Sequence, residues 1–223
     1  MDEKRIIRVS GRGRLRLRPD TTRLTVTLGG VFPEYGETLR RSSADTEALR
    51  EVAAALGFER EALKTLSFNI DTEYEGYNDK NGEYRQRFVG YRFTHVMKLE
   101  FPVDNELLGR TLYALAHSPA APELRISYAM RDAEAVKREL LGAAVADASA
   151  KAEALCRAAG VRLGDILRID HSSGEPELEV RPMARGLLAK NVMAESADGA
   201  YDMNVEPDDI TVDDSVTVTW EIK

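Results

Sequence analysis

Three histidines, His95, His117 and His171, carry the side chain best suited to acid–base chemistry near neutral pH. His95 alternates with apolar residues along a predicted strand, so we expect it to be buried and hydrogen-bonded in the core. His117 closes a predicted helix, where a structural role is expected. His171 precedes two serines and Glu175, but neighbouring residues of a strand point to opposite faces, and no nucleophile elbow accompanies them. The sequence therefore predicts no catalytic triad.

Three further features invite a chemical interpretation. Gly11-x-Gly13 lies inside a predicted strand, whereas a phosphate-binding loop needs its glycines where a strand meets a helix. We interpret the pair as a bulge, or as space for another backbone or a large side chain. Cys156 lies on the apolar stripe of a predicted helix and is expected to be a packed thiol. Four carboxylates lack the spacing of a calcium loop and indicate an acidic surface: Asp208, Asp209, Asp213 and Asp214. No metal or cofactor is predicted.

A row of arginines is the sharpest feature, and it consists of Arg12, Arg14, Arg16 and Arg18. Alternation places them on one face of a strand, about 6.5–7 Å apart, where they would repel one another if unpaired. They could face acidic strands of this fold or of a second copy, an acidic partner surface, or a nucleic acid. The net charge of −7 argues against nucleic acid. Residues 195–214 hold eight acidic and no basic residues, so the two ends of the chain could pair.

Three tyrosines surround a predicted hairpin at residues 75–84: Tyr74, Tyr77 and Tyr84. Tyrosines beside an exposed turn suit an interface, because they add contact area at little cost in entropy. They could equally be cross-strand pairs that steady the hairpin. Together with the four arginines, they form the candidate interface that the sequence offers.

Periodicity predicts an α+β fold of antiparallel or mixed sheets, with two shorter helices and one long helix packed on them. We expect one domain over residues 1–223, with a possible division into 1–103 and 104–223. Residues 174–209 lack periodicity and are interpreted as a long functional loop. The Pro19–Asp20 turn predicts that the first two strands form a hairpin. Strands are expected at 7–17, 22–30, 63–74, 85–101, 123–130, 162–172 and 210–222, and helices at 36–56, 105–117 and 132–159.

The composition, 43% hydrophobic and 31% charged, is that of a soluble globular protein that can fold without disulfides. The single cysteine permits neither an intrachain disulfide nor a cysteine-based zinc site. No apolar stretch has the length of a membrane span, and none of the first residues forms the apolar core of a secretory signal. We therefore expect no membrane span and a cytoplasmic location.

Four segments in order resemble the SIMPL family, which includes the YggE-like and periplasmic immunogen proteins. They are VSGRGRLRLRPDTTRLTVTLG near the start, FVGYRFTHVMKLEF in the middle, KAEALCRAAGVRLGDILRI after it, and VEPDDITVDDSVTVTWEIK at the end. The arginine-rich first strand and the long loop depart from the family pattern. The resemblance implies a fold and a tendency to associate. It implies no catalytic residues, so none is assigned.

These observations favour a non-catalytic, cytoplasmic protein-binding or self-assembling module that is homo-oligomeric, with stress response or signalling as the context that the resemblance implies. One alternative is a small-molecule hydrolase that uses residues 174–209 as a lid over an acidic site. Another is a binder of nucleic acid or of an anionic surface through the arginines of the first strand.

Overall fold

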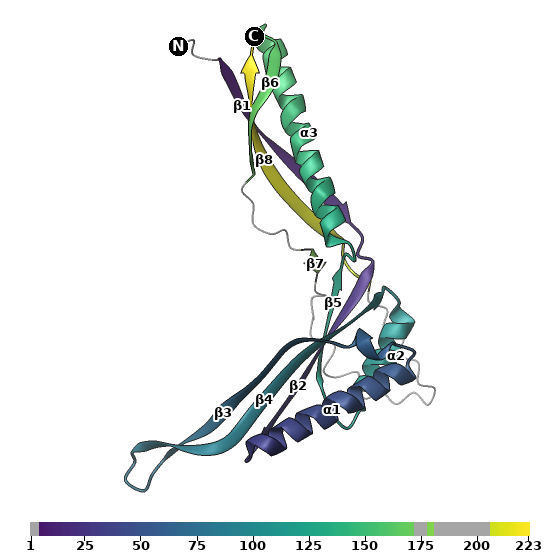
Figure 1. Ribbon diagram of the computed structural model, residues 1–223, viewed down its shortest axis with the longest axis vertical. Coiled ribbons are helices and arrows are strands. Elements are labelled where there is room, and N and C mark those ends of the chain that lie inside the picture. The colour runs from purple at the N-terminus through teal and green to yellow at the C-terminus, as the bar shows by residue number, and fades with distance from the viewer. Residues whose placement is uncertain (1–4, 172–177, 181–205) are drawn as a thin grey trace. The chain divides into compact units, whose positions relative to one another are not determined.

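The computed structural model describes residues 5–171, 178–180 and 206–223, and it confirms the α+β class (Figure 1). Contacts divide the chain into two units. The first contains described residues 5–20, 129–171, 178–180 and 207–223, and the second contains described residues 21–128 and 206. This grouping differs from the division at residue 103 considered above.

The first unit is built on a three-stranded antiparallel sheet. Its strand order is β1 (Ile6–Leu17), β8 (Ile210–Ile222) and β6 (Leu163–His171). β1 pairs with β8 along its whole length, from Ile6 opposite Glu221 to Leu17 opposite Ile210. The pairing of the first and last strands, raised by their opposite charges, is therefore observed.

The long helix α3 (Ala133–Ala159) packs on this sheet with a stripe of small residues that includes Ala144 and Ala148. Asp132 caps its start by accepting a hydrogen bond from the Ala135 amide at 2.8 Å, and Gly160 ends it in the left-handed conformation (φ 70°). A Cβ on Gly11 would overlap the Ala144 carbonyl and the Ala148 amide. The glycine pair therefore makes room for another backbone, one of its two predicted roles.

The sheet of the second unit has the strand order β3 (Lys64–Asn78), β4 (Tyr84–Pro102), β2 (Thr21–Phe32) and β5 (Glu123–Ala129), and the short strand β7 (Glu179–Val180) belongs to the first unit. In the second unit, helices α1 (Tyr35–Ala55) and α2 (Asn105–Ala116) and the 3₁₀ turn η1 (Arg60–Ala62) contribute to a core centred on β2 and β4. The fully buried members include Leu24, Val26, Leu49, Met97, Leu99 and Leu108.

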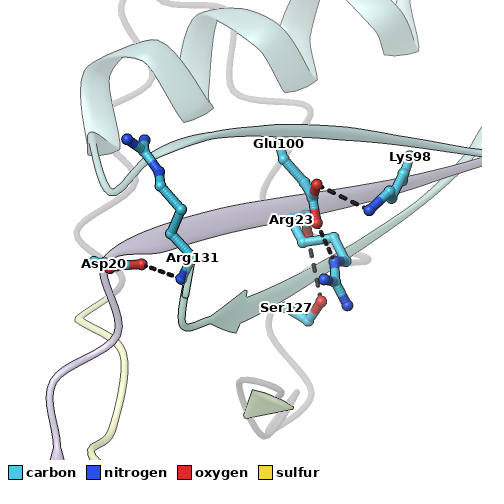
Figure 2. Close-up of polar contacts among 6 residues, drawn as sticks. All are labelled: Asp20, Arg23, Lys98, Glu100, Ser127 and Arg131. Atoms are coloured by element: carbon cyan, nitrogen blue, oxygen red, sulfur yellow. Dashed lines mark hydrogen bonds and ion pairs between the residues drawn. The ribbon is translucent and has the colours of Figure 1, made fainter. Parts of the chain in front are cut away.

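The predicted hairpin between the first two strands is wrong, because β1 and β2 belong to different sheets. Instead of closing a turn, Asp20 is held by the segment after β5. Its amide donates to the Ala129 carbonyl at 3.3 Å, and its carboxylate accepts the Arg131 amide at 2.8 Å (Figure 2). The turn signal at Pro19–Asp20 thus marks the exit from β1. It does not mark a strand pairing.

Candidate interaction surface

The hairpin of β3 and β4 extends beyond the rest of its sheet. β2 pairs with β4 from Pro102 only as far as Tyr91, so residues 73–90 continue as a ribbon of two strands, here called the arm. Figure 1 shows this arm projecting past β2 and α1. At its tip Gly82 adopts φ 79°, and the Asp79 carboxylate accepts the Asn81 amide at 2.9 Å. The hairpin predicted at residues 75–84 is confirmed.

One face of the arm is aromatic. Cross-strand register places Tyr74 opposite Phe88, and their ring centroids lie 5.7 Å apart. Phe88 contacts Tyr91 at 5.3 Å, and Tyr91 contacts Tyr35 at the start of α1 at 5.4 Å, each pair edge to face. Tyr84 lies over Gly76 on the same face. We call this set the aromatic face: Tyr35, Tyr74, Tyr84, Phe88 and Tyr91.

The aromatic face continues the face of the sheet on which α1 packs, but no described element covers it. Tyr84 is 69% exposed, Tyr74 53% and Phe88 44%. An isolated two-stranded ribbon is marginally stable in water, and single exposed aromatics are ordinary whereas a contiguous group is not. The arm therefore has the character of an interaction surface.

The opposite face of the arm is ionic. Arg92 donates to Glu73 at 2.7 Å and Arg87 donates to Glu75 at 2.7 Å. The hydrogen bond from Arg92 lowers the pKa of Glu73. Near the tip, the Asn81 amide and Arg85 lower the pKa of Asp79 in the same way. Because the guanidinium groups already meet carboxylates, this face has its partners within the arm.

Register also separates the three tyrosines that the sequence grouped together. Tyr77 lies opposite Arg85, whereas Tyr74 and Tyr84 lie on the aromatic face. Phe88, Tyr91 and Tyr35 were missed as candidates. The Asn-Gly pair alone would not have identified Phe88, because a two-residue turn at Asn81–Gly82 would place Val89 opposite Tyr74, one residue away from the observed register.

The arginine row finds acids within its own chain. Arg12 donates to Asp213 at 2.6 Å and Arg16 donates to Asp209 at 2.7 Å, both across the pair formed by β1 and β8. Arg14 lies opposite Asp213 in the register, and Arg18 lies exposed beyond the end of β1. Of the alternatives considered, the structure shows pairing with acidic segments of the same fold for Arg12 and Arg16.

His95 is a buried core residue, as predicted, and is 7% exposed. Its Nδ1 lies 3.0 Å from the Thr46 hydroxyl of α1, and its Nε2 lies 2.8 Å from the Thr65 hydroxyl of β3. Phe68 meets the ring edge to face at 5.2 Å. Burial, together with the charge of Arg50, lowers the pKa of His95. The imidazole thus joins α1 to β3 and β4 in its neutral form.

His171 forms the one acid–histidine contact of note in the described residues. Its Nε2 lies 2.9 Å from Oδ2 of Asp214, whose side chain is buried. Asp214 was expected to be part of an acidic surface. That interpretation is wrong, because Asp214 occupies an inward position of β8 in line with Val212 and Val216. Ser172, Ser173 and Glu175 lie outside the described residues.

The other candidates have structural surroundings. His117 Nδ1 lies 2.8 Å from the Tyr113 carbonyl at the end of α2, and Cys156 is buried in α3.

In the second unit Glu100 accepts from Arg23 at 2.7 Å and from Lys98 at 2.9 Å (Figure 2). Partial burial would raise the pKa of Glu100, but these two hydrogen bonds outweigh it, and the pKa is lowered.

In the part of the chain that the structure describes, no three acidic, histidine or cysteine side chains gather in a way that could hold a metal ion. Most of the predicted functional loop at 174–209 lies outside the described residues, namely 174–177 and 181–205, so its suggested role as a lid has no structural account.

Comparison with known proteins assigns the chain to a family. The family model for SIMPL, a protein of unknown function (DUF541), matches residues 7–220. The chain belongs to the SIMPL family. A 26 kDa periplasmic immunogenic protein of Brucella melitensis biotype 1 is 28% identical over 222 residues, covering 97% of this chain and 84% of the relative. The protein of the same name from Brucella abortus matches with the same identity and coverage. The resemblance to SIMPL proteins drawn from the four sequence segments is thus confirmed.

These relatives contradict the expected cytoplasmic location, because both SIMPL proteins are named as periplasmic. The expectation rested on the residues at the start of the chain, which say little about where a protein works. Among the described helices, none combines the length and the apolar character needed to cross a bilayer.

Proposed function

We propose that this SIMPL protein is a non-catalytic binding module that associates with other protein chains through the arm. The observation that carries the proposal is the uncovered aromatic face at residues 74, 84 and 88, which continues the core-facing side of the sheet. Apolar surface of this kind is stabilised when a partner removes it from water.

The charged groups of the described residues favour a binding module over a small-molecule hydrolase. A hydrolytic site needs titratable groups that converge on a reacting atom. Every described carboxylate with a lowered pKa is instead held by a basic side chain: Glu73 by Arg92, Asp79 by Arg85, Glu100 by Lys98 and Arg23, and Asp147 by Lys151. Ion pairs of this kind order a surface, and they keep these four carboxylates from acting as free acids or bases.

Two arginines of β1 also form their ion pairs within the chain. Carboxylates of β8 and of the segment just before it neutralise Arg12 and Arg16, so the cationic row offers much less charge to an anionic partner than its sequence suggests. Both curated relatives are periplasmic, and we propose the same compartment for this protein.

A photo-crosslinking amino acid at position 84 tests the proposed function in bacterial cells that express the protein. We expect adducts larger than one chain when the probe replaces Tyr84. A matched probe at Tyr113, a half-exposed tyrosine of α2 in the same unit, should give far fewer. Equal yields at the two positions would contradict association through the arm.

A further inference from the structure

We propose that the aromatic face binds the same face of a second copy of this chain, so that two arms stack face to face. The inference rests on the proposed function, because it names the partner of the same surface. A two-fold interface uses one surface patch twice, so that patch must be complementary to itself. The structure meets this requirement in charge, in shape and in area.

Charge is the first argument. The other positions on the aromatic face of the arm are Gly76, Asn78 and Gln86, which carry no charge. Two charged pairs lie nearby. Glu75 pairs with Arg87 on the opposite face of the arm, and Asp79 pairs with Arg85 at the turn. Two copies of the aromatic face can therefore meet without like charges opposing one another.

Shape is the second argument. The chain from Tyr74 through Phe88 and Tyr91 to Tyr35 consists of edge-to-face contacts, so neighbouring rings lie in steeply inclined planes and the surface is not flat. Aromatic rings prefer to meet edge to face or offset, and a surface that offers both can pair with itself. Sheets that pack through such faces lie about 10 Å apart.

Area is the third argument. An aromatic side chain buries up to about 150–250 Å², so a half-exposed one offers about 100 Å². Four of the five are about half exposed or more, and Tyr91 is less exposed, so the set gives roughly 400–500 Å² on each copy and roughly 800–1,000 Å² in total, close to the lower limit for a specific interface. The aromatic face alone can thus support a reversible dimer.

Cysteine trapping on purified protein tests the inference. Gln86→Cys lies on the aromatic face between Tyr84 and Phe88, and Glu75→Cys lies on the ionic face of the same ribbon. The native Cys156 is buried and provides a quiet background. After mild oxidation we expect a disulfide-linked dimer in non-reducing gels from Gln86→Cys, with at most traces from Glu75→Cys. Circular dichroism confirms that both variants are folded.

Adding Phe88→Ala to Gln86→Cys should abolish the dimer, whereas adding Tyr77→Ala, which removes a tyrosine of similar exposure from the ionic face, should leave it. Equal trapping at positions 75 and 86, or no dimer at either, would overturn the face-to-face dimer. If position 86 gives no dimer while the probe at position 84 captures another protein in cells, the proposed function stands and the second copy is the wrong partner. If both experiments give only single chains, the proposed function fails as well.

Discussion

Two regions of the molecule present unusual side chains to solvent: the ladder between β1 and β8, and the arm of β3 and β4. Two arginines of the ladder have acidic partners within the chain, whereas the aromatic face of the arm is not covered by any described element. In the ladder, Arg12 and Arg16 meet Asp213 and Asp209. In the arm, the ionic face is paired internally while the aromatic face remains uncovered. Charges can be satisfied by water or by a single opposite charge, whereas a contiguous apolar face is satisfied only by another surface. Of these two regions, the aromatic face is therefore the one that would be stabilised most by binding a partner.

The largest expected effect concerns how the ladder is held against α3. Gly11→Ala should lower the free energy of unfolding of the first unit by at least about 2–3 kcal/mol, because the added Cβ would overlap the α3 backbone. Gly142→Ala, within α3 itself and with open space at its Cβ, should instead be neutral or stabilising by up to about 1 kcal/mol. Urea unfolding measures both variants. A Gly11→Ala protein as stable as wild type would show that helix and sheet do not pack this closely.

The second effect concerns the buried part of β3 and β4, from which the arm extends and which is here called the root of the arm. His95→Ala should lower the free energy of unfolding by about 1–3 kcal/mol, because it removes buried packing and leaves the hydroxyls of Thr46 and Thr65 without their shared partner. The arm variant Tyr77→Ala should change stability by less than about 0.5 kcal/mol, since its side chain is half exposed. Equal losses in urea unfolding would contradict the difference between a buried root and an exposed arm.

The pH dependence of stability sharpens the same point. Burial lowers the pKa of His95 in the folded protein. The unfolded chain therefore takes up a proton near pH 6.5 where the folded chain does not, so stability is complete above that pH and declines below it. Between pH 7.5 and 5.5, wild type should lose on the order of 1 kcal/mol more than His95→Gln. This window lies above the range in which the lowered carboxyl pKa values matter. Parallel pH profiles of the two proteins would show that His95 can be charged in the fold.

The smallest effect is expected from the ladder's ion pairs. A double-mutant cycle of Arg12→Gln and Asp213→Asn should give a coupling of about 0.2–1 kcal/mol that shrinks as salt increases, because both side chains are largely exposed. A coupling of several kcal/mol that is insensitive to salt would mean that the pair is shielded by a further surface, and the ladder would then be a second interface.

The sequence predicted the helices well because their signals are local. Asp104 and Asp132 cap α2 and α3 where expected, and Gly160 ends α3. The hairpin of the first two strands was wrong because pairing is decided by distant strands, and the partner of β1 is the last strand of the chain. A turn signal cannot contain that information.

The candidate interface could be predicted only in part. Composition and spacing identified the tyrosines and arginines, but cross-strand register decides which side chains share a face, and it assigned Tyr77 to the ionic side. Asp214 was misread because an acid at an inward position of an apolar strand looks like its acidic neighbours until its burial is known. His95 was predicted correctly because its strand alternates cleanly.

Sedimentation equilibrium of four purified proteins tests the central claim most directly. These are wild type, the arm double variant Tyr74→Ala/Phe88→Ala, the matched arm variant Tyr77→Ala, and the ladder double variant Arg14→Ser/Arg16→Ser. We predict that wild type, Tyr77→Ala and the ladder variant share the same association, in low and in high salt, and that Tyr74→Ala/Phe88→Ala sediments as a single chain. Loss of association in the ladder variant with retention in the arm variant would contradict the account, and so would a wild type that remains a single chain at every concentration.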